Sequence, residues 1–233
     1  MSRVNLNQKV MPKIISAPPV TAVLEILEEL WKQGSDPAKV FYDEPLDGLI
    51  ETVLSQNTND RNRDMAFERL KLKGDWPSIA KLAKEEIAEV IKPAGLSNQK
   101  AVTILRVLDE VQKKYGHYSL KELKKGTPEQ AWNFMTGIQG VGPKTAACVL
   151  AFDLGFPAFP VDTHVARICK RLGWAEEKDS PAEIQEKLEQ IVPSGMKTAG
   201  HLNVIQHGKN ICKARAPLCE QCPLRGLCPS SSC

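Results

Sequence analysis

Four cysteines near the end of the printed sequence constrain its fold more than any other feature. They are spaced as Cys212-x6-Cys219-x2-Cys222-x5-Cys228, and prolines at 217, 223 and 229 interrupt the same stretch. Four thiols this close require a compact loop around a shared centre, and both zinc and iron–sulfur clusters accept four thiolates. Structural zinc sites usually combine two short Cys-x2–4-Cys pairs. This stretch has only one such pair, so the spacing favours a [4Fe–4S] cluster.

The total of seven cysteines is odd, which argues against a disulfide framework. The first 20 residues contain Arg3, Lys9 and Lys13 but no continuous apolar core, so we expect a disordered tail and not a signal peptide. We therefore expect a cytoplasmic protein, associated with the nucleoid if the source is bacterial, in which thiols stay reduced. The cysteine spacing also differs from that of bacterial ferredoxins, which disfavours electron transfer as the main role.

The composition allows a globular fold and does not by itself identify a partner. The chain of 233 residues is 42% apolar and has a net charge of +3. This mildly basic balance permits nucleic-acid binding but is too weak to indicate it alone. No apolar run approaches the roughly 20 residues that span a bilayer, so we expect no transmembrane helix.

Apolar residues recur at helical spacing through most of the chain, as at Val23, Leu27 and Leu30. Thr127 and Ser180 each precede a proline, and an N-cap residue before a proline is a common helix start. Alternating strand patterns are nearly absent. The sequence therefore predicts an all-α protein of roughly ten helices.

Residues 136–147 interrupt the helical pattern with Gly137, Gly140 and Gly142, followed by Pro143. A glycine loop that opens a helix exposes free N–H groups at the positive end of the helix dipole, so it binds anions. No predicted strand precedes the glycines, which excludes the Rossmann and P-loop interpretations. The order of helix, hairpin and helix is similar to a helix-hairpin-helix motif, which binds DNA backbone without sequence preference. A plain glycine turn between two helices remains the alternative.

Lys144 lies in the first turn of the predicted helix after this hairpin. The positive end of the helix dipole disfavours a second positive charge there, and partial burial would also lower the pKa of the amine. A neutral amine is a nucleophile and forms Schiff bases, so Lys144 is a candidate to attack the sugar C1′ of a damaged nucleotide. The alternative is a lysine that only binds phosphate.

Asp162 follows the extended pair Phe159-Pro160 and precedes an amphipathic helix. It suits the N-cap position of that helix. A capping carboxylate is held rigidly, as is required of a group that deprotonates an amine and stabilises an oxocarbenium-like sugar. The structural and the catalytic roles are compatible. We interpret His164 as a helix-surface or supporting residue and not as a catalytic one.

Basic residues accompany the cysteines. Lys213 and Arg215 lie between the first two cysteines, where contacts to DNA phosphates would be natural. Cys148 and Cys169 are expected to be small buried side chains, and Cys233 a thiol of the tail.

Together these residues resemble the endonuclease III family of helix-hairpin-helix DNA glycosylases, from about residue 22 to residue 228. The resemblance implies a bifunctional DNA glycosylase/AP lyase of base excision repair, with Lys144 and Asp162 as catalytic residues. Such an enzyme removes damaged bases, oxidised pyrimidines above all, and nicks abasic sites by β-elimination through a lysine Schiff base. The resemblance rests on Gly140-Val141-Gly142-Pro143-Lys144-Thr145-Ala146, Val161-Asp162-Thr163-His164-Val165-Ala166-Arg167, His207-Gly208-Lys209 and the four cluster ligands Cys212, Cys219, Cys222 and Cys228.

The resemblance also implies a set of DNA contacts. In the family, a polar residue of a Leu-Ser-x-x-x-x-Asp turn enters the gap left by the extruded nucleotide. Here the family's glutamine position aligns with Asn57, and Gln56 stands one residue earlier, so both are candidates. Backbone carbonyls near Ile138 and Val141 would hold a monovalent cation. The expected DNA-binding residues are Gln56, Asn57, Gly140, Gly142, Thr145, Lys213 and Arg215.

The implied fold has two helical domains that flank a DNA-binding groove. A six-helix barrel spans 45–156, with the helix-hairpin-helix at 136–147. A discontinuous cluster domain combines 21–44 with 157–228, and tails lie at 1–20 and 229–233. The expected partner is double-stranded DNA with damaged bases or abasic sites, bound by a monomer.

Two other functions remain open. A monofunctional mismatch glycosylase of the same superfamily, acting on uracil, thymine or adenine, would lack a lysine at the position of Lys144. A non-enzymatic DNA-binding module with a zinc-stabilised loop would be colourless and would give no product with any lesion.

Overall fold

The computed structural model describes residues 17–33 and 43–231, and within these ranges the regular elements are all helical. The predicted all-α class is confirmed. No helix in these ranges is long and apolar enough to cross a membrane. Most of the predicted tail at 1–20 lies outside the described residues, and Val20 already begins the first helix.

The α-helices are α1 (Val20–Trp31), α2 (Pro45–Ser55), α3 (Asp60–Lys71), α4 (Trp76–Ile79), α5 (Lys84–Val90), α6 (Ser97–Tyr115), α7 (Pro128–Thr136), α8 (Pro143–Val149), α9 (Thr163–Leu172), α10 (Pro181–Ile191) and α11 (Lys197–Asn210).

Local sequence explains where several helices begin and end. Thr127 and Ser180 each form a capping box at the start of α7 and α10, as predicted from the prolines that follow them. Gly116 ends α6 in the left-handed region at φ 76, where a residue without a Cβ is favoured. Short 3₁₀ and π turns fill several connections: η2 (Lys92–Ala94), η3 (Lys121–Lys125), η4 (Leu150–Leu154), η5 (Ser194–Met196) and η6 (Cys219–Gln221).

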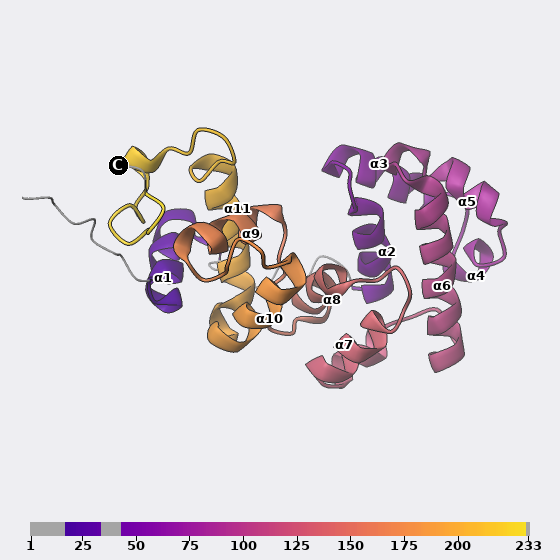
Figure 1. Ribbon diagram of the computed structural model, residues 1–233. Helices are drawn as coiled ribbons and strands as arrows, with labels where there is room; N and C mark the ends of the chain where they lie inside the picture. The colour runs from indigo at the N-terminus through magenta and orange to yellow at the C-terminus, as the bar shows by residue number, and fades with distance from the viewer. Residues whose placement is uncertain (1–16, 34–42, 232–233) are drawn as a thin grey trace, which may run out of the picture.

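The buried apolar side chains form two separate clusters. The larger contains residues from Leu46 to Ala158, and the smaller combines residues of α1 with residues from Phe159 to Leu224. Figure 1 shows the same division, with α2 to α6 on one side, α1, α9 and α11 on the other, and α8 between the two groups. This division supports the domain boundaries of the sequence analysis, which we keep as a proposal.

Helix α8 lies at the junction of the two clusters. It packs against α2 and α7 of the larger cluster and against α10 of the smaller one. Gly140, in the turn before α8, has φ 103, and a Cβ there would lie 2.4 Å from Oγ1 of Thr103 in α6. The hairpin between α7 and α8 therefore needs a glycine at this position both for its backbone conformation and for its contact with α6.

Candidate active site and cysteine loop

The hairpin between α7 and α8 lies on the protein surface. Gly140, Gly142 and Pro143 are exposed, whereas Ile138 and Val141 are buried in the larger cluster. The N–H of Val141 donates to the carbonyl oxygen of Ile138 at 3.0 Å, which closes the turn. The exposed glycines are thus open to a DNA backbone, while the two apolar residues anchor the hairpin. A cation held by the carbonyls near Ile138 and Val141 stays a prediction.

The structure separates the roles of Gln56 and Asn57. The Nε2 atom of Gln56 donates to the carbonyl oxygen of Gly140 at 3.5 Å and to the hydroxyl of Thr145 at 3.3 Å. Asn57 is exposed and adopts the left-handed backbone conformation at φ 52. Gln56 therefore links the α2–α3 turn (residues 56–59) to the hairpin, and Asn57 is the residue of the pair that faces solvent.

Thr145 differs from its predicted place on the DNA surface. Its side chain is buried, and its hydroxyl accepts the hydrogen bond from Gln56. A DNA contact by the Thr145 side chain is therefore not available in this structure, and only its backbone could take part. The sequence pattern placed Thr145 in the first turn of α8, but could not show that this face of the helix packs against α2.

A second turn lies beside the α2–α3 turn and was missed by the sequence analysis. The buried ammonium group of Lys100 donates to the carbonyl oxygens of both Leu54 and Ala94, and so joins the end of α2 to the turn before α6. Leu96 in that turn is 50% exposed and has φ 48. Strained backbone is characteristic of functional sites, and apolar side chains are used as wedges between bases. The signal available in the sequence was a leucine directly after Gly95.

Lys144 and Asp162 each lie at the start of a helix. Lys144 lies in the first turn of α8 and is exposed, so the partial burial considered in the sequence analysis is absent from the free protein. Asp162 is half-buried and is the N-cap of α9, because its carboxylate accepts the N–H of Val165 at 2.8 Å. The predicted capping role is confirmed. This bond fixes the carboxylate at the start of α9.

The two residues share the same neighbours, Cys148 and His201. Burial raises the pKa of the Cys148 thiol, Lys144 opposes this rise through a hydrogen bond and its charge, and the Asp162 carboxylate adds to it. Burial lowers the pKa of His201 to about 4, while the charges of Asp162 and Lys144 act on it in opposite directions. The charges of Lys144 and Asp162 therefore act on the same two buried side chains, one from α8 and one from α11.

His164 is not part of this group of residues. Its Nδ1 atom lies 3.2 Å from the guanidinium of Arg167, and a Cβ on Gly208 would lie 2.9 Å from its own Cβ. The side chain therefore packs between α9 and α11, in agreement with a supporting role. Gly208 allows this close approach because it has no side chain.

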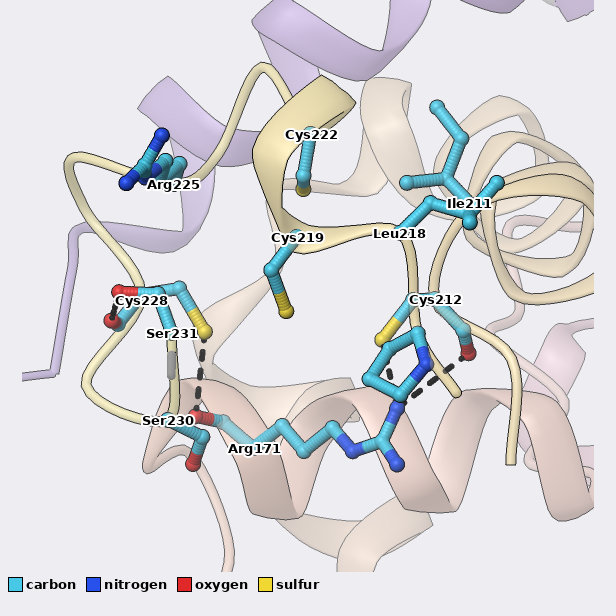
Figure 2. Close-up of a pocket in the computed structure, with 11 residues that line it drawn as sticks. Arg171, Ile211, Cys212, Leu218, Cys219, Cys222, Arg225, Cys228, Ser230 and Ser231 are labelled. Carbon is cyan, nitrogen blue, oxygen red and sulfur yellow. Dashed lines mark hydrogen bonds between the residues drawn. The ribbon is translucent and has the colours of Figure 1, made fainter. Parts of the chain in front are cut away.

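The four predicted cluster ligands line a single cavity after α11, shown in Figure 2. The thiols of Cys212, Cys219, Cys222 and Cys228 are all free and half-buried. Burial raises the pKa of Cys222 and Cys228, and the neighbouring thiols raise it further. Four thiolates crowded in this way repel each other unless a cationic centre lies between them. The donor set and its arrangement around a cavity therefore fit an iron–sulfur cluster.

Two arginines of α9 attach this helix to the cysteine loop. Arg171 donates to the Cys212 thiol at 3.2 Å and to the carbonyl oxygen of Lys213 at 2.8 Å. Arg167 donates to the carbonyl oxygens of Cys212 and Gly208, both at 2.9 Å. The helix that starts at Asp162 is therefore joined directly to the first cysteine. Lys213 and Arg215 themselves are exposed, as a phosphate contact requires.

Comparisons with known proteins agree with this arrangement. Residues 50–194 match the HhH-GPD superfamily of base excision DNA repair proteins, and residues 212–228 match the iron-sulfur binding domain of endonuclease III. Endonuclease III of Thermotoga maritima is 36% identical over 189 residues, which cover 79% of this chain and 83% of that protein. Endonuclease III of Haemophilus influenzae is 32% identical over 210 residues, 89% of this chain and 95% of the relative.

A solved structure extends the similarity to three dimensions. The structure of a trapped endonuclease III–DNA covalent intermediate superposes with a TM-score of 0.75 at 30% identity, and covers 92% of this chain and 97% of that one. The chain belongs to the endonuclease III family, whose members are base excision repair DNA glycosylases with AP lyase activity and a [4Fe–4S] cluster.

Proposed function

We propose that this DNA glycosylase and AP lyase removes damaged bases, oxidised pyrimidines above all, by attack of Lys144 on the deoxyribose. The observation that supports the proposal is the shared environment of Lys144 and Asp162, whose charges act on the same thiol and the same imidazole. The reaction needs a nucleophile and a proton acceptor, and the Lys144 amine and the Asp162 carboxylate, each at the start of a helix, can take these two roles. We further propose that the protein acts as a monomer.

The chemistry follows from these two groups. Asp162 accepts a proton from the ammonium of Lys144, and the free amine attacks C1′ as the bond to the base breaks. The base leaves with its electron pair and takes up a proton, and the sugar ring opens to an imine between Nζ and C1′. The imine makes the C2′ proton acidic, and its removal expels the 3′ phosphate. The Asp162 carboxylate also stabilises positive charge on the sugar during the first step.

The substrate nucleotide must leave the duplex before Lys144 can reach its sugar. We assign Asn57 to the gap that remains, because Asn57 is exposed and Gln56 is bound to the hairpin. Leu96 on the neighbouring turn is an apolar side chain of the kind that stacks between bases. Gly140 and Gly142 are proposed to contact the DNA backbone, and Lys213 and Arg215 its phosphates.

The cysteines at 212, 219, 222 and 228 would hold the [4Fe–4S] cluster. When bound, the cluster would supply positively charged iron that offsets part of the negative charge of the four thiolates, and it would fix the loop that follows α11. The bonds from Arg171 and Arg167 to Cys212 then place this loop, with Lys213 and Arg215, next to α9.

The proposal is tested by borohydride trapping on duplexes with a single lesion. Wild-type protein should become attached to duplexes that contain an oxidised pyrimidine or an abasic site, and Lys144→Ala should abolish both trapping and strand nicking. Lys125→Ala, which removes an exposed lysine of η3, is the matched control and should trap normally. Undiminished trapping by Lys144→Ala would refute the assignment. Excision only from mismatched uracil, thymine or adenine would contradict the proposed substrate.

A further inference from the structure

The extended segment that leads to Asp162 is held by side chains at three consecutive residues. The N–H of Phe159 donates to Oε1 of Glu189 at 2.7 Å, and the N–H of Val161 donates to Oε1 of Gln185 at 3.3 Å. Between them, the carbonyl oxygen of Pro160 lies 2.8 Å from Nδ1 of His201. This segment lies outside the helices, so its buried backbone groups need such partners. The position of Asp162 therefore depends on α10 and α11.

Gln185 makes one more contact than a residue that only supports this segment would need. Its Nε2 atom donates to the carbonyl oxygen of Pro143 at 3.4 Å. Pro143 is the first residue of α8 and directly precedes Lys144. A glutamine amide has a donor and an acceptor at the same end, so one side chain can bind an N–H and a carbonyl together. The two partners fix which end of the amide faces which segment.

The bridge made by Gln185 thus connects the residue before Lys144 with the residue before Asp162. Gln185 is 2% exposed, so water competes little for its two hydrogen bonds. The bridge also crosses the junction between the two apolar clusters, because α8 contributes to the larger cluster and Val161 to the smaller one. Among the described residues, α10 also lies directly against both α8 and α9.

We propose that Gln185 is a positioning residue that fixes the Lys144 amine relative to the Asp162 carboxylate. The inference rests on the proposed function of these two residues. Covalent catalysis requires reacting groups within a narrow range of distances, and a displacement of about 1 Å far from the reacting atoms can cost a hundredfold in rate. Loss of the bridge lets α8 and the segment 159–161 move independently at the point where proton transfer and attack occur.

The test compares Gln185→Met with Gln190→Met. Methionine keeps the length and volume of the side chain but provides neither hydrogen bond, and Gln190 is an exposed residue of the same helix. Imine formation is measured as the rate of borohydride trapping on a pre-formed abasic site at saturating enzyme. We expect Gln185→Met to trap between about ten and a hundred times more slowly, with unchanged affinity for the duplex, unchanged iron content and unchanged helical circular dichroism. Gln190→Met should match the wild type in every measurement.

Three results would overturn the inference. The first is a folded Gln185→Met protein that traps at the wild-type rate. The second is a slower rate fully explained by weaker DNA binding, since that pattern indicates a general structural role. If Gln185→Met does not fold, Gln185→Asn replaces it in the test. This variant keeps the amide, but its side chain is too short to reach both Val161 and Pro143. A wild-type trapping rate in Gln185→Asn is the third result. Failure of the wild type to trap would instead reject the proposed function itself.

Discussion

The ammonium group of Lys100 donates a hydrogen bond of 2.7 Å to the carbonyl oxygen of Leu54, the penultimate residue of α2. A second bond of 2.8 Å joins the same group to the carbonyl oxygen of Ala94. Lys100 is 2% exposed, and burial lowers its pKa. A charged side chain in the core is costly unless its donors are satisfied. This one connects two turns whose exposed residues, Asn57 and Leu96, both have a positive φ.

Replacement of Lys100 by methionine should therefore disturb both turns. The carbonyl groups of Leu54 and Ala94 would lose their donor, so we expect the free energy of unfolding to fall by about 1–3 kcal/mol. Base excision from duplex DNA should slow, while cleavage of a pre-formed abasic site in single-stranded DNA should change little. Chemical denaturation and the two nicking assays measure these effects. Lys92→Met, at an exposed lysine of η2, is the control, and an equal effect of both variants would contradict the explanation.

Asn57 is expected to fill the gap left by the extruded nucleotide, and Gln56 to support the hairpin. Asn57→Ala should slow base excision from duplexes by about tenfold, which corresponds to roughly 1.4 kcal/mol of lost support for the unstacked state. Nicking of abasic sites in single strands should be unaffected. Gln56→Ala should instead weaken binding to duplexes of every sequence, because the hairpin loses its link to α2. An inverted pattern between the two variants would reverse the assignment.

Lys213 and Arg215 test the electrostatic part of DNA binding. Both are exposed in the cysteine loop. Each phosphate contact contributes about 0.9 to the slope of log K against log salt concentration. The double variant Lys213→Ala, Arg215→Ala should therefore lower this slope by about two without changing the preference between lesions. Measurement of duplex affinity across a salt series decides the point, and a slope equal to that of the wild type would exclude phosphate contacts by these residues.

Asp153 gives a pH-dependent contribution to stability. Burial, with a smaller contribution from the nearby Glu51 carboxylate, raises the pKa of its carboxyl from 3.8 to about 7. The native state therefore binds more protons than the unfolded state between these pH values, so the contribution of Asp153 is fully present below pH 3.8 and is lost as the pH rises towards 7.

Asp153→Asn replaces the carboxyl with an amide that is uncharged at every pH, so it should remove the loss of stability that occurs as the pH rises. The variant should be more stable than the wild type by up to about 4 kcal/mol at neutral pH, and the difference should vanish near pH 4. Urea unfolding of both proteins at a series of pH values measures the effect. A constant difference across the series would show that burial does not disfavour the ionised carboxylate.

The sequence predicted the parts of the site that depend on local patterns. Glycines mark the hairpin, Asp162 stands before an amphipathic helix, and four spaced cysteines define a loop, so each could be found without a structure. Gln185 and Lys100 could not, because Val161 lies 24 residues from Gln185 and Leu54 lies 46 residues from Lys100. Neither the helical spacing of apolar residues nor a capping pattern distinguishes the buried Gln185 of α10 from the exposed Gln190.

Burial also explains two differences between the expectations and the structure. The sequence placed Thr145 among the DNA contacts, but the packing of α8 against α2 buries its side chain. We also expected partial burial of Lys144 from the sequence, but this residue is exposed in the free protein. Both residues lie in the first turn of α8. Which face of that turn is covered depends on α2 and the turn after it, where Gln56 lies 89 residues before Thr145.

The central claim is that the amine of Lys144 forms the covalent intermediate. Borohydride trapping on an abasic-site duplex, followed by proteolysis and mass spectrometry of the attached peptide, identifies the reacting residue directly. We predict that the reduced sugar is attached to Nζ of Lys144 and to no other amine. Attachment to another lysine, or to the amino terminus, would contradict it.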